Sequence, residues 1–252
     1  QLRQLAPSIV HTWIFAANAY GRWSALRAKV PVILAGERCV DPWKSTWHYW
    51  IDRTLAKRTT GLITNSQGVV QFYARRGIEA SAFHVIPNGI LPRQSTRIDR
   101  QTIARRLGIS PEKRWIGAVG RLWHQKNYKD MIWAAEMVRI KVEDLQLVIV
   151  GEGPERERLE HYRDQVQAAR AVHFVGHRSD VAELMPHFHL FWNSSLYEGQ
   201  SNALMEAMQA GVPPLVSDIA GNRDLVRHET EGLLFPVGDV GALMQGTVRL
   251  LD

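Results

Sequence analysis

Two carboxylates and two cations are the residues of this chain whose types and spacing could perform chemistry. Glu198 and Glu206 stand eight positions apart, around a polar turn that leads into a predicted helix. Arg121 and Lys126 follow an earlier apolar run. Cations hold phosphate groups, and carboxylates accept hydrogen bonds from hydroxyls. These residue types together predict a site for a ligand that carries both phosphate and sugar.

The turn between the two glutamates is the most specific of these features. Ser201 or Asn202 is placed to cap the helix that follows, and the turn itself is Gly199 and Gln200. Free N–H groups in the first turn of a helix favour an anion. Glu206 lies about one turn into that helix, near enough to its start to accept hydrogen bonds from a sugar diol. The alternative is that both glutamates are solvated, one in a loop and one on a helix face.

The cations follow a predicted strand and precede a predicted helix, in the segment that begins at Gly120. Ligands of open α/β sheets bind where the strands end. The fork of Arg121 matches a phosphate, and Lys126 supplies a second positive charge. Such charge would stabilise a departing diphosphate. The alternative is two solvated cations on a loop.

Gly151-Glu152-Gly153-Pro154 also follows a strand pattern. It resembles half of a dinucleotide-binding fingerprint but lacks the third glycine and the full spacing. A tight turn with Pro154 starting the next helix is the favoured interpretation.

Several other chemistries fit less well. Paired carboxylates could act as the acid and base of a glycoside hydrolase, but the cations argue for a phosphate that a simple glycoside lacks. Residues 102–110 resemble the first helix of a helix-turn-helix, yet a strand at Trp115 follows where a recognition helix should stand, so no nucleic-acid partner is expected. The histidines show no zinc spacing, and no Asp-x-Asp triplet is present, so neither a metal nor a cofactor is expected.

The elements that must position these residues alternate between short apolar runs and helical patterns. Near-continuous apolar strands separated by helices predict an α/β fold whose parallel sheets are covered on both faces. The expected strands are residues 9–13, 32–34, 61–64, 84–86, 115–119, 147–150, 172–175, 190–192 and 214–216. Pro87-Asn88-Gly89 and the Pro- and Arg-containing stretch 91–100 indicate a linker. We expect an incomplete lobe over 1–92 and a second lobe over 93–252.

Composition and net charge do not decide the functional class of the protein. Of the 252 residues, 45% are hydrophobic and 22% charged, with a net charge of +6 that favours anionic partners. The single cysteine, Cys39, fits a reducing compartment, and no apolar run is long enough to span a membrane, so a cytoplasmic location is expected. Trp43, Trp47 and Trp50 recur at helical spacing beside cations. Core packing is the favoured interpretation, and a peripheral contact at the inner membrane face is the alternative.

The motifs together resemble the group 1 glycosyltransferases, a retaining family (family four) of GT-B architecture with two Rossmann-like doubly wound lobes. The stretches that carry the resemblance are Val85–Ile90, Gly117–Arg121 with Lys126, Leu147–Pro154, Val172–Gly176, Glu198–Met208 and Ala220-Gly221. Residues 9–13, 63–66 and 76–78 match more loosely. The resemblance therefore covers the whole chain but is strongest from residue 84 onward.

The resemblance implies a role for each matching residue. Arg121 and Lys126, after Gly120, would contact the donor diphosphate. Glu198 would hold hydroxyls of the transferred sugar and would act with the two cations in catalysis. The backbone of Gly199, Gln200, Ser201 and Asn202 would lie close to sugar and phosphate. Glu206 would hold the ribose, and the backbone around Gly176 and Arg178 would meet the base. The reaction would be metal-independent hexosyl transfer from a nucleotide-sugar, such as a UDP-sugar, to a saccharide or lipid-linked acceptor, as in cell-envelope polysaccharide synthesis.

Two departures from the family pattern limit this inference. The family often places a catalytic histidine after the strand at 32–34, whereas Gly36-Glu37-Arg38 stands there. The family's first strands and its final crossing helix are not recognisable, so this segment alone is expected to bind nucleotide but to transfer sugar poorly. A nucleotide-sugar epimerase or hydrolase of the same architecture, and a non-catalytic nucleotide-sugar-binding module, remain alternatives.

Overall fold

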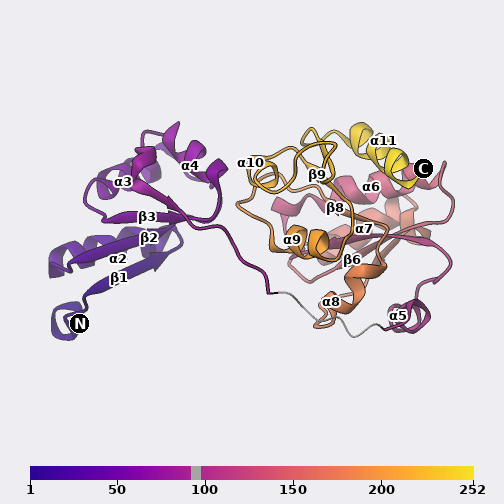
Figure 1. Ribbon diagram of the computed structural model, residues 1–252, viewed down its shortest axis with the longest axis horizontal. Helices are drawn as coiled ribbons and strands as arrows, with labels where there is room; N and C mark the ends of the chain where they lie inside the picture. The colour runs from indigo at the N-terminus through magenta and orange to yellow at the C-terminus, as the bar shows by residue number, and fades with distance from the viewer. Residues whose placement is uncertain (92–97) are drawn as a thin grey trace. The chain divides into compact units, whose positions relative to one another are not determined.

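A computed structural model describes residues 1–91 and 98–252, which form two compact units. Unit 1 comprises residues 1–89 together with 197–200, and unit 2 comprises residues 90–196 together with 201–252 (Figure 1). The boundary expected between residues 92 and 93, and most of the expected linker, lie outside the described residues.

Unit 1 is built on a four-stranded sheet whose strands are all parallel and follow the order β1-β2-β3-β4. Its strands are β1 (Ile9–Trp13), β2 (Val32–Gly36), β3 (Gly61–Thr64) and β4 (Phe83–Val85). Its helices are α1 (Leu2–Leu5), α2 (Phe15–Ala28), α3 (Thr46–Ala56), α4 (Gln67–Ala74) and the 3-10 turn η1 (Ala80–Ala82). Because each crossover helix returns the chain, every strand ends at the same edge of the sheet, which we call its carboxyl edge.

Unit 2 is built on a six-stranded parallel sheet with the order β10-β9-β8-β5-β6-β7. Its strands are β5 (Arg114–Val119), β6 (Leu145–Val150), β7 (Val172–Phe174), β8 (Leu190–Asn193), β9 (Pro214–Ser217) and β10 (Leu233–Phe235). Its helices are α5 (Arg100–Leu107), α6 (Tyr128–Arg139), α7 (Arg156–Gln165), α8 (Val181–Leu184), α9 (Asn202–Gln209), α10 (Ala220–Arg223) and α11 (Val240–Leu251). The 3-10 turns are η2 (His124–Lys126), η3 (Ala168–Arg170) and η4 (Met185–His187). Read from β7, the strand order is that of a Rossmann fold, with a switch point between β5 and β8.

The unit 2 sheet is buried on both faces, which explains why its strands are apolar without interruption. Ile116 and Leu147 pack into one core with α6 and α11, whereas Trp115 and Val148 pack into the other with α8 and α9. Successive residues of a strand point to opposite faces of the sheet. Two neighbouring residues of a strand therefore pack into different cores. Figure 1 shows α6 and α11 on one side of this sheet and α8 and α9 on the other. The predicted α/β class with two parallel-sheet lobes is confirmed.

Most element bounds agree with the sequence patterns, and the differences have local causes. Strand β10, which was not predicted, is an apolar run of three residues at the sheet edge, too short for a periodic signal. Helix α7 begins at Arg156 after the N-cap Glu155, so Pro154 lies in the turn and does not start the helix. After α5 the chain enters β5 with no second helix between them, which agrees with the expectation against a helix-turn-helix.

The tryptophan stripe contradicts the expectation of core packing. Trp43, Trp47 and Trp50 are 55%, 57% and 61% exposed. Asp52, on the opposite face of α3, is buried instead because it pairs with Arg22 and Lys44. In the described part of the chain, no helix is both long and apolar enough to cross a bilayer.

Candidate donor-binding site

The switch point of the unit 2 sheet brings two loops together at its carboxyl edge. One loop follows β5 and carries Arg121 and Lys126; the other follows β8 and leads towards α9. Leu196 N donates to Gln125 O at 2.8 Å, and Ser194 Oγ lies 3.0 Å from Lys126 O. These bonds hold the two loops side by side, at the place where open α/β sheets bind ligands.

The loop after β5 holds two of the predicted site cations. Arg121 is exposed, and its guanidinium lies over the ring of Trp123, with Cζ 4.4 Å from the ring centroid. Lys126 ends the 3-10 turn η2. A Cβ atom on Gly120 would lie 3.3 Å from Lys126 Cε, so a glycine leaves space for the lysine stem. The contact with Trp123 orders the Arg121 guanidinium. Among the described residues, no carboxylate pairs with it.

Gly151 and Gly153 support this loop from the neighbouring strand end. A Cβ atom on Gly151, whose φ is +145°, would lie 1.9 Å from Gly120 O. A Cβ atom on Gly153 would lie 2.2 Å from Leu122 O, and Leu122 N donates to Glu152 O at 2.9 Å. These glycines allow two backbones to pack closely, which favours the turn interpretation over a dinucleotide fingerprint.

Buried hydroxyls and amides hold the loop after β8. Ser217 Oγ donates to Ser195 O at 2.6 Å, and Ser195 N donates to Asn193 Oδ1 at 3.0 Å. Asn222 Nδ2 donates to Ser217 O at 2.8 Å. Because these groups are buried and paired, the loop is fixed from β9 and α10 as well as from β8.

Helix α9 carries the predicted cap and the ribose-binding candidate. Ser201 is its N-cap, and the Ser201 hydroxyl accepts from Leu204 N at 3.4 Å. Glu206 is half-buried, and its carboxylate makes no hydrogen bond or ion pair within the described residues. Asn202 opens the helix and is exposed. The first turn of α9 and the Glu206 carboxylate therefore both belong to the unit that carries Arg121 and Lys126.

Gly176 and Arg178 lie after β7, two strands from β5 in the same sheet. Gly176 has a φ of +74°, and its carbonyl accepts from Gly151 N at 2.8 Å. Arg178 forms two hydrogen bonds of 2.7 Å with Asp180. These bonds lower the pKa of Asp180 and raise that of Arg178. The Arg178 side chain is thus engaged by Asp180, which leaves the backbone of this turn as its candidate ligand-binding group.

Glu198, Gly199 and Gln200 belong to unit 1 rather than to unit 2. Glu198 is 9% exposed, and the Gln200 side chain accepts from Asn88 N at 2.8 Å. A Cβ atom on Gly199 would lie 2.1 Å from Arg38 O. The predicted site residues are therefore divided between the units: Arg121 and Lys126 belong to unit 2, and Glu198 belongs to unit 1.

Sequence reasoning missed two supports of this site. Trp123 lies two positions from Arg121, and its contact with the guanidinium depends on the turn geometry of the loop. Ser194 and Ser195 follow a strand directly, which is a signal for strand-end function that the sequence did contain.

Comparisons with known proteins agree with the fold. The family described as Glycosyl transferases group 1 matches residues 113–252, and the family described as Glycosyltransferase Family 4 matches residues 1–93. The chain belongs to the group 1 glycosyltransferases. Anabaena Alr3699/HepE in complex with UDP-glucose has the same fold, with a TM-score of 0.88 at 22% identity over 100% of this chain and 71% of that one.

Two curated relatives match most of the chain. The Escherichia coli UDP-Gal:alpha-D-GlcNAc-diphosphoundecaprenol alpha-1,3-galactosyltransferase is 29% identical, over 97% of this chain and 66% of its own length. The GDP-mannose-dependent alpha-mannosyltransferase of Mycobacterium tuberculosis is 27% identical, over 94% of this chain and 62% of its own length. The chain spans less than two thirds of the length of these relatives.

Proposed function

We propose that the protein transfers a hexose from a nucleotide-diphosphate-sugar to a saccharide or lipid-linked acceptor with retention of configuration. The observation that carries the proposal is the switch point of unit 2, where Arg121, Lys126 and the first turn of α9 follow adjacent strands. A diphosphate requires such positive groups when no metal is used. UDP is the proposed nucleotide, because the relative that covers 97% of this chain uses UDP-Gal.

Each group has a role in this proposal. Arg121 and Lys126 bind the diphosphate and stabilise the charge that develops as it leaves. Glu206 accepts hydrogen bonds from the ribose hydroxyls, and Glu198 accepts hydrogen bonds from hydroxyls of the transferred sugar. The backbone near Gly176 contacts the base. The bond between the anomeric carbon and the phosphate oxygen breaks, and the acceptor oxygen bonds to the same face of that carbon. The acceptor proton passes to the leaving phosphate oxygen.

The test combines binding with product analysis. Thermal unfolding is measured with UDP, GDP, ADP and the corresponding nucleotide-sugars. A ligand that binds the folded state raises the midpoint temperature of unfolding, so the largest increase identifies the nucleotide. The intact protein is then incubated with the donor and candidate acceptors. A new α-glycoside supports the proposal. A changed or freed sugar without a glycoside identifies an epimerase or hydrolase, and donor binding without any product identifies a binding module; both outcomes would contradict transfer.

We also propose that α3 contacts an anionic membrane surface. Trp47 and Trp50 on α3, and Trp43 in the turn before it, are exposed. They lie close in sequence to Arg53, Lys57 and Arg58, which are exposed as well. Tryptophan prefers the interface, and cations bind anionic headgroups.

Vesicle binding tests this contact. The triple change Trp43→Ala, Trp47→Ala, Trp50→Ala should abolish sedimentation with phosphatidylglycerol vesicles, while Trp23→Ala, an exposed tryptophan on α2, should not. Equal sedimentation of both variants, or equal binding to neutral phosphatidylcholine vesicles, would contradict a specific role for α3.

A further inference from the structure

The end of β2 carries two charged residues that point in opposite directions. Glu37 follows Gly36 and is buried, whereas Arg38 is exposed. This alternation is expected of an extended chain, whose successive side chains face opposite ways. The segment thus has an anchored residue and a solvent-facing residue next to each other, at the carboxyl edge of the unit 1 sheet.

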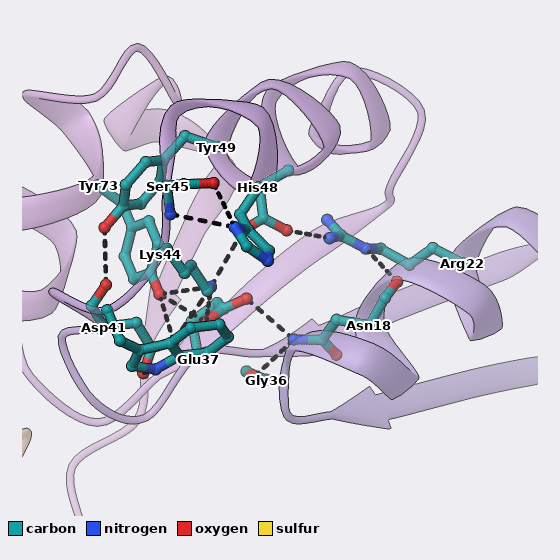
Figure 2. A network of polar contacts seen from close by, with 12 residues as sticks. Asn18, Arg22, Gly36, Glu37, Asp41, Lys44, Ser45, His48, Tyr49 and Tyr73 are labelled. Carbon is teal, nitrogen blue, oxygen red and sulfur yellow. Dashed lines mark hydrogen bonds and ion pairs between the residues drawn. The ribbon is translucent and has the colours of Figure 1, made fainter.

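Glu37 is held in a buried network of charges (Figure 2). Its carboxylate accepts hydrogen bonds from Asn18 Nδ2 at 2.9 Å, Tyr73 OH at 2.8 Å and Lys44 Nζ at 3.3 Å. Burial raises the pKa of Glu37, and the charge of Lys44 opposes this effect. The Glu37 side chain is fully engaged within the unit and faces away from solvent, so it does not act on a substrate.

Lys44 ties this network together. Its ammonium is completely buried and lies 3.0 Å from Asp52 Oδ2 and 3.1 Å from Asp41 Oδ2. Arg22 donates to the other oxygen of Asp52 at 2.6 Å. Every charge of the network has an opposite partner. Figure 2 shows Lys44, Asp41 and Tyr73 gathered around Glu37, which follows β2. The backbone next to Arg38 is therefore held in place by the buried contacts of the Glu37 side chain.

Arg38 differs from the other cations of this region. Arg22 and Lys44 face carboxylates, whereas Arg38 has none among the described residues. Its Nη2 atom donates to the neutral side-chain oxygen of Asn88, which also accepts from Asn65 Nδ2 at 3.2 Å. The guanidinium also lies over the ring of Trp13, at the end of β1, with Arg38 Cζ 5.8 Å from the ring centroid. The guanidinium is oriented by neutral groups, and its charge is left for an external anion.

A buried amide fixes the group that orients Arg38. Asn65 directly follows β3 and is 3% exposed. Its Nδ2 atom donates to Asn88 Oδ1, the same oxygen that accepts from Arg38. The position of the guanidinium is therefore set by side chains at the ends of the unit 1 strands.

We propose that Arg38 binds a phosphate of the acceptor, in the diphosphate that links its sugar to a lipid. The proposal rests on the proposed function, in which the donor diphosphate belongs to Arg121 and Lys126 of unit 2. A guanidinium free of carboxylates suits a phosphate, which it can hold through two parallel hydrogen bonds. The relative that covers 97% of this chain uses a diphosphoundecaprenol-linked acceptor.

Steady-state kinetics of the intact protein test the proposal. The probes are GlcNAc-diphosphate on a short lipid and octyl α-GlcNAc, which lacks phosphate. Arg38→Ala should raise KM for the diphosphate probe about 10- to 100-fold, because charged hydrogen bonds to phosphate are lost. It should leave KM for the neutral probe and for the donor unchanged, and Arg38→Lys should restore part of the loss.

The control is Arg75→Ala, an exposed arginine at the end of α4, whose crossover places it at the opposite edge of the sheet. It should change neither KM. Equal losses with both probes from Arg38→Ala would indicate a structural role, and a weaker affinity for UDP would place Arg38 on the donor side. Either result, or no change at all, would overturn the proposal.

Direct binding separates this proposal from the proposed function. Calorimetry of the diphosphate probe with UDP-loaded protein requires no turnover. Weaker binding by Arg38→Ala than by Arg75→Ala supports the Arg38 site even if no sugar is transferred. Equal binding by the two variants overturns it even if transfer occurs.

Discussion

At the scale of single residues, the buried ammonium of Lys44 is the centre of the charge network in unit 1. Arg121, Lys126 and Glu206 were predicted as site residues because residue type and strand-end position are both visible in the sequence, and their roles stay predictions. The Lys44 network was not predicted, because Arg22 on α2 and Tyr73 on α4 join it from distant parts of the chain. Such contacts leave no local pattern in the sequence.

Replacing Lys44 should destabilise unit 1 strongly. Lys44→Ala leaves buried carboxylates without their counterion, and removing one partner of a buried pair costs about 3–5 kcal/mol. Urea unfolding should show this loss. The control Lys57→Ala, an exposed lysine after α3, should change stability by less than about 0.5 kcal/mol. Equal stability of the two variants would show that the network contributes nothing.

At the scale of elements, periodicity predicted strands well and helix ends less well. Helix α9 was predicted with its bounds because Ser201 caps it and an apolar face follows. Strand β10 was missed because its pairing with β9, and not its own three residues, defines it. Sheet pairing is a property of two segments, so short edge strands are the elements that one sequence predicts least.

The segment between α8 and β8 should make unit 2 sensitive to acid. Burial lowers the pKa values of His187 and His189 below the ordinary 6.5. The folded state then binds fewer protons than the unfolded state, so stability is complete above about pH 6.5 and falls as pH decreases below it. A protonated His189 would also lose the hydrogen bond that its Nδ1 accepts from Trp115 N at 3.1 Å.

Thermal unfolding between pH 7.5 and 5 measures this effect. The double variant His187→Gln, His189→Asn should lose less stability over this range than the wild type, because neither amide titrates. His161→Gln, which changes an exposed histidine on α7, should follow the wild type. A double variant that loses as much as the wild type would assign the acid sensitivity to other groups.

At the scale of the whole molecule, two units with separate cores should respond differently to nucleotide. The cores of unit 2 and those of unit 1 share no residues. Leu147→Ala, in the unit 2 core, should cost about 2–5 kcal/mol and weaken UDP binding. Leu62→Ala, a matched change in the unit 1 core, should cost a similar amount. UDP should protect the amides of β5 and β6, but not those of β2 and β3, from hydrogen exchange; equal protection of both sheets would contradict a nucleotide site confined to unit 2.

Calorimetry with UDP and uridine tests most directly whether the donor diphosphate binds at the carboxyl edge of unit 2. The double variant Arg121→Ala, Lys126→Ala should bind UDP about 100-fold more weakly and uridine with unchanged affinity, because only UDP carries the phosphates. The control Lys141→Ala, Arg170→Ala removes equal charge from exposed sites that precede β6 and β7. It should bind both ligands like the wild type. If the Arg121, Lys126 variant binds UDP as tightly as this control does, the diphosphate lies elsewhere and the account is wrong.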